Sequence, residues 1–352
     1  MDSLIRTLRI LLAPLIPVYR FVIRVRNDFF DKGKFRTEKV NALVISVGNL
    51  TVGGSGKTPM VIYISRLFKK LGFDVGVLSR GYMRSTKGYL YVSDGEKIFH
   101  DVNEAGDEIH QTVIECGVKA AVSENRVKGA QRLIEDSGVS LIVLDDGFQH
   151  RWIHRDLDIV LFDQRFLTTE DKYEKMLLPT GNLREPYESL KRADVIIINR
   201  KFSEKQEIPV EIKKYFLRKP VFYGFYHAVG FVDVKNEEFF DIKDFVGQKS
   251  LIINGIANPD SFFKVLNSLS VDTASRMIFL DHNKYNNDEV QKIRKEFYSS
   301  NSSSVITTHK DAVKLNRFKR ELDDIDIYYL KIEMEIENNK EFEELILQRI
   351  KS

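Results

Sequence analysis

The stretch VISVGNLTVGGSGKTP, residues 44–59, decides the fold of this 352-residue chain. Its apolar first part predicts a β-strand, and a glycine-rich turn then leads into a helical pattern over residues 58–71. Such a turn is typical of a phosphate-binding loop, because backbone amides can close around phosphate oxygens at a helix N-terminus. We therefore expect a nucleotide to be bound by Gly53, Gly54, Ser55, Gly56, Lys57 and Thr58.

Two side chains of this loop have distinct expected tasks. Lys57 would supply a cation for the β- and γ-phosphates, and Thr58 a hydroxyl for Mg²⁺. The first glycine of the usual spacing is replaced by Thr51, with Gly48 three residues earlier, so the front of the loop must have a different shape. A glycine-rich turn without a ligand is the alternative, but Gly-Lys-Thr between a strand and a helix favours the phosphate loop.

A second motif, LIVLDDGFQH, occupies residues 141–150. Nucleoside triphosphatases hold magnesium where an apolar strand ends in carboxylates, so Asp145 and Asp146 are candidate Mg²⁺ ligands. A plain acidic turn is the alternative. The phosphate loop earlier in the same predicted domain favours the metal site.

Two other nucleotide-dependent classes fit this sequence less well. His154, Arg155 and Asp156 imitate the catalytic loop of protein kinases, but Leu161 stands where that loop needs asparagine, and no kinase-type glycine loop precedes it. The sequence also lacks the Asn-Lys-x-Asp tetrapeptide that selects guanine. We therefore expect ATP as the nucleotide.

The order of apolar runs predicts an α/β fold with a doubly wound, mainly parallel sheet like that of P-loop nucleoside triphosphatases. Nearly continuous apolar runs, typical of strands covered on both faces, occupy residues 42–47, 75–78, 120–122, 141–144, 159–162 and 195–198. Helix-length segments, such as residues 58–71 and 125–137, lie between several of them.

The alternation of predicted strands and helices is interrupted near residue 201, and this interruption predicts a division into domains. We expect a nucleotide-binding domain over residues 31–200 and a linker over 201–249, whose aromatic part at 221–240 has the alternation of a β-hairpin. A second, smaller α/β domain would then cover residues 250–352. Its predicted elements are strands at 251–253 and 305–308, a helix after Pro259 and a last helix over 341–350.

The composition excludes several classes of protein. A hydrophobic fraction of 43% with 30% charged residues is ordinary for a folded soluble protein. Cys116 is the single cysteine, so no intramolecular disulfide can form and a reducing compartment such as the cytoplasm is expected. A net charge of +3 is too small for a general nucleic-acid binder, so no nucleic acid partner is expected.

The first 30 residues differ from the rest of the chain in charge. Residues 1–26 contain five arginines and only one acidic residue, and an uncharged run at 10–19 is about half the length of a membrane-spanning helix. Arginines on both sides of that run, with no cleavage site after it, argue against a signal peptide. We expect residues 1–30 to form a basic amphipathic segment on an anionic membrane surface; a helix capping the protein's own core is the alternative.

The motifs taken together resemble the tetraacyldisaccharide 4′-kinase family, the lipid A kinases of Gram-negative bacteria. The resemblance extends over nearly the whole chain and is far more specific than a phosphate loop alone. It rests on Gly48-Asn49 with Gly53-Gly54-Ser55-Gly56-Lys57-Thr58-Pro59, Ser79-Arg80-Gly81-Tyr82, Gly106-Asp107-Glu108, Asp145-Asp146-Gly147-Phe148-Gln149-His150, and Leu178-Pro179 with Gly181 and Leu183-Arg184-Glu185-Pro186.

This resemblance implies a reaction and its residues. The γ-phosphoryl group of MgATP would pass to the 4′-hydroxyl of an acylated glucosamine disaccharide 1-phosphate, giving lipid IVA. By the same resemblance, Asp107 accepts the hydroxyl proton with help from His282, and Arg184 offsets charge on the phosphoryl group. Other residues that the resemblance places in the substrate site are Asn49, Arg80, Tyr82, Gln149, His150 and Glu185.

A lipid acceptor also implies a cellular location. We expect the cytoplasmic face of the bacterial inner membrane, where a peripheral enzyme can reach both ATP and lipid. Two rival classes share the phosphate loop and the aspartates. One is a soluble kinase of a small metabolite, which has no use for the basic N-terminal segment. The other is a nucleotide-dependent switch that hydrolyses ATP without phosphorylating an acceptor.

Overall fold

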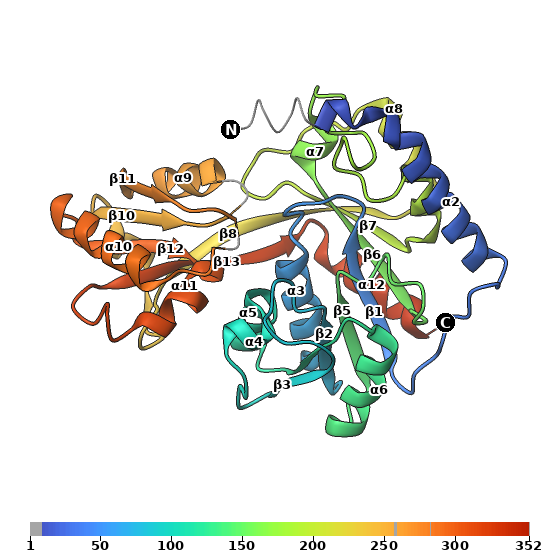
Figure 1. Ribbon diagram of the computed structural model, residues 1–352, viewed down its shortest axis with the longest axis horizontal. Coiled ribbons are helices and arrows are strands. Elements are labelled where there is room, and N and C mark those ends of the chain that lie inside the picture. The colour runs from blue at the N-terminus through green and yellow to red at the C-terminus, as the bar shows by residue number, and fades with distance from the viewer. Residues whose placement is uncertain (1–8, 257–258, 282, 352) are drawn as a thin grey trace.

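A single curved sheet runs through the whole molecule (Figure 1). The computed structural model describes residues 9–256, 259–281 and 283–351. Across these residues, thirteen strands belong to the sheet, in the order β11-β10-β12-β13-β8-β7-β6-β1-β5-β2-β4-β3, with β9 paired to β8. The predicted α/β class is confirmed, and the sheet has a larger and a smaller half on either side of β8.

The larger half contains the predicted parallel strands. Its central strands pair in parallel, and β3 closes the edge antiparallel to β4. The bounds are β1 (Leu43–Asn49), β2 (Val75–Ser79), β3 (Leu90–Asp94), β4 (Lys119–Val122), β5 (Leu141–Asp145), β6 (Leu157–Asp163) and β7 (Val195–Asn199).

Helices cover both faces of this half, which explains why its strands are apolar throughout. Alternate residues of β1 show the division: Ile45 and Val47 pack on one face and Val44 on the other. The first face is covered by α3 (Lys57–Lys70), α5 (Asp107–Cys116) and α12 (Asn339–Lys351). The second is covered by α6 (Arg126–Ser137), α7 (Gln164–Thr168), α8 (Val210–Phe216) and the inner side of α2 (Ile16–Asp31).

In the smaller half, helices again cover both faces of the sheet, and each face has its own hydrophobic core. Its parallel strands are β10 (Lys249–Asn254), β11 (Asp272–Ile278) and β12 (Ser304–Thr308), with β13 (Ile327–Ile336) parallel to β12. Helix α9 (Pro259–Ser268) packs on one face, and α10 (Asn287–Ser299) and α11 (His309–Leu315) pack on the other. The short elements of the chain are α4 (Val102–Ala105), η1 (Ala13–Leu15), η2 (Tyr187–Arg192), η3 (Ile242–Phe245) and η4 (Asn316–Phe318).

The two halves are joined by strand β8 (Val221–Asp233), which lies within the predicted linker of residues 201–249. Its first residues pair in parallel with β7, and the rest pairs antiparallel with β13. The hairpin predicted over 221–240 is present only at the far end, where Phe231 and Val232 pair with β9 (Phe239–Phe240). Alternation along this segment thus reflects one long strand with different neighbours on its two halves.

The last helix does not belong to the half in which we predicted it. Helix α12 follows β13 back across the junction, and its Phe342 and Ile346 are buried in the core of the larger half. The Phe342 ring lies 5.3 Å from that of Phe222 and 6.0 Å from that of Tyr63. The predicted domain of residues 250–352 is therefore wrong at its end, because an amphipathic pattern does not specify which core it meets; the division at 201–249 stays a prediction.

The N-terminal segment forms a helix on the outside of the larger half. Ile16 and Tyr19 of α2 pack against its core, whereas Val18, Phe21 and Val22 are more than half exposed. Among the residues that the structure describes, no helix is both long enough and apolar enough to cross a membrane. The helix thus has one face on the protein and one apolar face toward solvent.

A buried carboxylate ties the two halves together. Glu115 of α5 lies 2.5 Å from Arg66 of α3, 3.1 Å from Nδ1 of His309 on α11 and 3.5 Å from Lys331 of β13. Burial by itself would raise the pKa of Glu115, but these three partners outweigh it and lower the pKa to about 2. Ionised Glu115 therefore stabilises the contact between α5 and α11.

We expect Glu115→Gln to lower the free energy of unfolding by about 3 kcal/mol at pH 7, the value of a pKa lowered from 4.5 to about 2. A lowered carboxyl pKa stabilises the fold above the unfolded-state value, so the difference from wild type should shrink as the pH falls from 4.5 toward 2. Urea unfolding over this pH range measures it. The exposed Glu344→Gln is the control, and a difference that does not change with pH would contradict the assignment.

Candidate active site

The phosphate loop connects β1 to α3, as predicted. Gly56, at the N-cap of α3, has φ +94°, a conformation that side-chain-bearing residues rarely adopt. A Cβ atom there would lie 2.1 Å from Nδ2 of Asn199 and 2.4 Å from the hydroxyl of Tyr226. Only glycine therefore fits where the loop turns into the helix.

The side chains of two asparagines form hydrogen bonds that hold the loop. Nδ2 of Asn49 donates to Oγ of Ser55 over 2.8 Å, and Nδ2 of Asn199 donates to the carbonyl of Ser55 over 3.1 Å. Asn199 also donates to the Tyr226 hydroxyl over 2.8 Å. Asn199 and Tyr226 were missed at the sequence level. A usable signal was present for Asn199, because it ends an apolar parallel strand as Asp145 does.

The acidic turn lies directly beside the phosphate loop. Strand β5 is the parallel neighbour of β1, and Asp145 is in register with Val47. The next residue, Asp146, has φ +56°, and its side chain, 37% exposed, points toward the loop, with Oδ1 3.7 Å from Nζ of Lys57. The two motifs singled out in the sequence therefore form one site.

Arg184 reaches this site from a distant loop. Its guanidinium makes two hydrogen bonds of 2.8 Å to the Asp146 carboxylate and a third to Oδ1 of Asn49. Its backbone N–H donates to the carbonyl of Leu50 over 2.7 Å. Arg184 does not form an ion pair with its neighbour Glu185, which pairs with Arg192 instead, at 2.9 Å.

The two aspartates differ in electrostatics. Burial, together with the carboxylates of Glu108 and Asp146, raises the pKa of Asp145 despite the nearby Lys57. Burial would also raise the pKa of Asp146, but Lys57 and Arg184 outweigh it and hold that pKa well below its usual range. Asp146 is thus an anion whose charge is balanced by neighbouring cations. Among the described residues, no cation is in such contact with the carboxyl group of Asp145.

The residues at this site fit a magnesium ion that binds together with the phosphates of a nucleotide. Oδ1 of Asp145 is buried and makes no hydrogen bond to any described residue, while Oδ2 accepts one from Ser79 over 3.3 Å. Within the described parts of the chain, no three His, Cys, Asp or Glu side chains come together as a metal site. Mg²⁺ usually takes only one or two carboxylates and completes its shell with phosphate and water, so Asp145, Asp146 and Thr58 remain suitable ligands.

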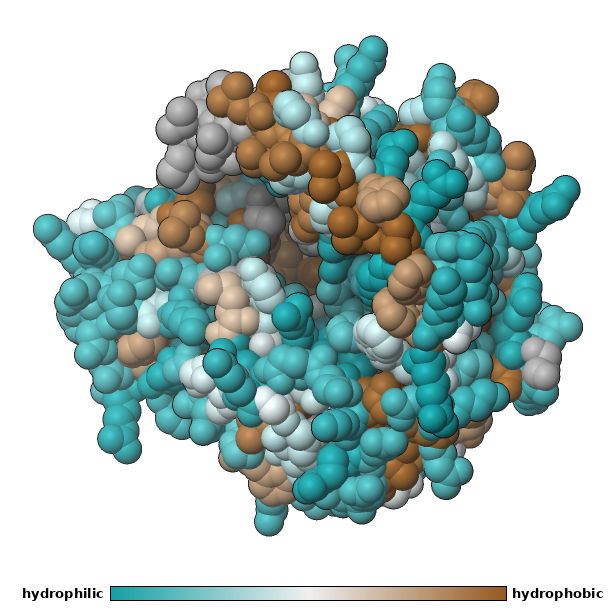
Figure 2. All heavy atoms as spheres, turned by 45° about the vertical axis from the view of Figure 1, so that its right-hand side comes forward, coloured by the Kyte–Doolittle hydropathy of each residue, from teal (hydrophilic) through white to brown (hydrophobic). Residues whose placement is uncertain are grey.

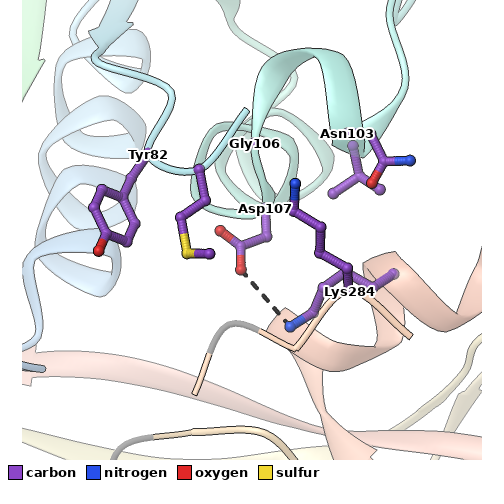
Figure 3. Close-up of a pocket in the computed structure, with 8 residues that line it drawn as sticks. Tyr82, Asn103, Gly106, Asp107 and Lys284 are labelled. Atoms are coloured by element: carbon purple, nitrogen blue, oxygen red, sulfur yellow. Dashed lines mark ion pairs between the residues drawn. The ribbon is translucent and has the colours of Figure 1, made fainter. Parts of the chain in front are cut away.

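Asp107 begins helix α5 on the other side of the site. Gly106, just before it, has φ +103°, a conformation that residues with a side chain rarely adopt. This turn places the Asp107 carboxylate in a small pocket with Tyr82, Met83, Asn103 and two lysines, Lys284 and Lys314, from the smaller half (Figure 3). Arg80 and Tyr82 are exposed on the rim. His282 lies outside the described residues.

Three other predicted residues lie under the N-terminal helix. Nε2 of Gln149 donates to the carbonyl of Asn49 over 2.8 Å. Burial, with the charges of Arg126, Arg26 and Arg80, lowers the pKa of His150 to about 4, so this imidazole is neutral at pH 7. Glu185 is completely buried and accepts a hydrogen bond from Asn27 of α2 over 3.0 Å. It therefore anchors α2; a direct role toward substrate stays a prediction.

Comparison with known proteins agrees with this geometry. Residues 8–351 match the family described as Tetraacyldisaccharide-1-P 4′-kinase. A protein of Syntrophus aciditrophicus named tetraacyldisaccharide 4′-kinase is 35% identical over 347 residues, which cover 95% of this chain and 91% of the relative. The chain belongs to the tetraacyldisaccharide 4′-kinase family.

Other members of the tetraacyldisaccharide 4′-kinase family support the match in sequence and structure. A protein of Aquifex aeolicus with the same name is 34% identical over 342 residues, 96% of this chain and 98% of the relative. The crystal structure of LpxK from Aquifex aeolicus in complex with ATP has a TM-score of 0.80 and 33% identity, covering 97% of this chain and 99% of that one. The described residues therefore have the fold of the family.

We expect Asn199→Ala to weaken ATP binding about tenfold, because the Ser55 carbonyl and the turn at Gly56 lose the side chain that holds them. Tyr226→Phe is the matched control: it removes only the hydroxyl that bonds to Asn199 and should change binding much less. Calorimetric titration with ATP measures both. Equal binding by Asn199→Ala and wild type would show that the loop does not depend on this support.

Proposed function

We propose that this chain transfers the γ-phosphoryl group of ATP to the 4′-hydroxyl of an acylated glucosamine disaccharide 1-phosphate, giving lipid IVA in lipid A biosynthesis. One observation carries the proposal: the glycine-rich loop after β1 lies beside the acidic turn after β5, and the charge of Glu108, next to Asp107, acts on Asp145, in a chain that matches the tetraacyldisaccharide 4′-kinase family over residues 8–351. The acceptor comes from the family and the phosphoryl chemistry from the site.

The nucleotide would be held by the phosphate loop. Backbone amides at Gly53, Gly54, Ser55 and Gly56 would close around phosphate oxygens, and Lys57, whose side chain is 16% exposed, would contact the β- and γ-phosphates. Mg²⁺, held by Asp145, Asp146 and Thr58, would neutralise charge on the phosphates. Arg184, now bonded to Asp146, would lie within reach of the phosphoryl group.

The acceptor hydroxyl needs a base, because an alcohol is a poor nucleophile until its proton leaves. We assign that role to Asp107, aided by His282. The hydroxyl oxygen forms a bond to the γ-phosphorus, the bond from that phosphorus to the bridging oxygen of ADP breaks, and the hydroxyl proton passes to the Asp107 carboxylate. Arg80, Tyr82, Asn49, Gln149, His150 and Glu185 remain substrate-site candidates.

The N-terminal helix would place the enzyme on its lipid. Exposed Leu11, Leu15, Val18, Phe21 and Val22 form an apolar face, and Figure 2 shows apolar surface running along this part of the molecule above a hollow. Arg20 and Arg24 are exposed on the same helix and suit anionic headgroups. We propose peripheral binding at the cytoplasmic face of the bacterial inner membrane, with α2 lying in the interface.

We expect Lys57→Ala to lower lipid phosphorylation by about 10³-fold, because phosphoryl transfer depends on positioned cations. The assay incubates the enzyme with labelled ATP and the disaccharide 1-phosphate lipid in detergent micelles, followed by chromatography of the lipid phase. Lys70→Ala, at the other end of α3 and exposed, is the control.

Different results in the same assay would favour the two rival classes. Label in inorganic phosphate alone, at a rate indifferent to the lipid, would indicate an ATP-hydrolysing switch. Label in a water-soluble sugar but not in the lipid would indicate a small-metabolite kinase. Either result would overturn the proposed function.

The double variant Val18→Asp/Val22→Asp should release the protein from anionic vesicles, because two carboxylates then occupy the exposed face of α2. Wild-type binding should also weaken as salt rises, since the arginine attraction is screened. Vesicle sedimentation measures both effects. Val246→Asp, an equally exposed apolar position on the smaller half, is the control, and retention of the double variant on vesicles would argue against an interfacial α2.

A further inference from the structure

A lysine of the smaller half faces the proposed base of the larger half. Lys314, on α11, is buried, yet its Nζ makes no aligned hydrogen bond among the described residues. Nζ lies 2.9 Å from Oδ1 of Asp311 and 3.8 Å from Oδ2 of Asp107. Lys314 and Asp107 line the same pocket, and a dashed line in Figure 3 marks their ion pair.

The position of this ammonium is set from within the smaller half. Asp311 accepts hydrogen bonds of 2.8 Å from the backbone N–H of Gly255 and from the Thr308 hydroxyl, so its carboxylate is held from two sides. Lys314 follows one helical turn later and pairs with that carboxylate. Burying an ammonium is unfavourable unless an anion accompanies it, and Asp311 supplies that anion. Residues of the smaller half alone therefore fix the position of the Lys314 ammonium group.

The charged groups around Asp107 come from both halves. Lys310 pairs with Glu108 at 3.4 Å, and the carboxylates of Glu108, Asp107 and Asp281 raise the pKa of this buried lysine against the effect of burial. Among the described residues, the titratable groups near Asp107 or its immediate neighbours include Glu108 and His110 on α5, Lys310, Asp311 and Lys314 on α11, and Asp281 and Lys284 in the loop before α10. Lys314 forms an ion pair with Asp107 itself.

We propose that Lys314 is a positioning residue of the kinase reaction, which holds the Asp107 carboxylate ionised and turned toward the acceptor hydroxyl. The inference rests on the proposed function, in which Asp107 receives the hydroxyl proton. At 3.8 Å the ammonium attracts the carboxylate without the short, aligned bond that would compete with the hydroxyl. The smaller half thereby supplies the cation that positions the proposed base of the larger half.

The pH profile of kcat/KM for the lipid separates this role from a structural one. Without the cation, protonation of the Asp107 carboxylate becomes easier, so the acid limb of Lys314→Met should move upward by roughly one pH unit. Activity at pH 7 should fall about 10²-fold, the usual result of a misplaced catalytic group. Lys314→Arg, which keeps the charge, should restore the wild-type limb. The exposed Lys319→Met on the same half is the control.

The outcomes are distinguishable from failure of the proposed function. An unshifted acid limb in Lys314→Met, with loss of activity alone, would overturn the inference, and thermal unfolding and ATP titration would show whether that loss reflects a damaged fold. Lys314→Arg with the same shifted limb as Lys314→Met would overturn it as well. Near-wild-type activity of Asp107→Asn would instead remove Asp107 as the base, and with it the basis for this role of Lys314.

Discussion

The parallel pairing of β1 with β5 is the constraint on which the site depends. Because Val47 is in register with Asp145, the loop after β1 and the turn after β5 emerge side by side at the carboxyl edge of the sheet. The apolar strands on which they stand are buried on both faces, so neither turn can shift relative to the other without disturbing the core. Lys57, Asp146 and Arg184 then meet as a compact group of charges.

Residues close to this group of charges also contact helix α2, for which we propose membrane binding. Tyr19 of α2 donates to the carbonyl of Arg184 over 2.9 Å, Asn27 donates to Glu185, and Arg26 bonds to the carbonyl of Gln149. One face of α2 is thus hydrogen-bonded to residues that flank Asp146, while the opposite face is apolar and exposed. A helix bound in a lipid interface would therefore hold the phosphoryl-transfer site close to the lipid surface.

On the other side of the site, α5 meets α11 through charge rather than through apolar packing. Glu115, near the end of α5, gathers cations from both halves, and the first residues of the helix, Asp107 and Glu108, pair with Lys314 and Lys310. The contact between the two halves beside the site is therefore built on charged side chains.

Much of this protein was readable in the sequence because its signals are local. Continuous apolar runs predicted the parallel strands, and the glycine-rich turn and the DDG turn marked the loops that the structure brings together, since glycine conformations and strand-end carboxylates are properties of a few neighbouring residues. The binding of phosphate and metal at these loops stays a prediction. Tertiary structure decided what depends on distant partners. Arg184 joins Asp146 and not its neighbour Glu185, Asn199 supports Ser55 from a strand that is 144 residues further along the chain, and α12 crosses back to the larger core. Lys314 reaches Asp107 only because β8 and β13 bring the two halves face to face, and no pattern along the chain records which side chains meet across such a junction.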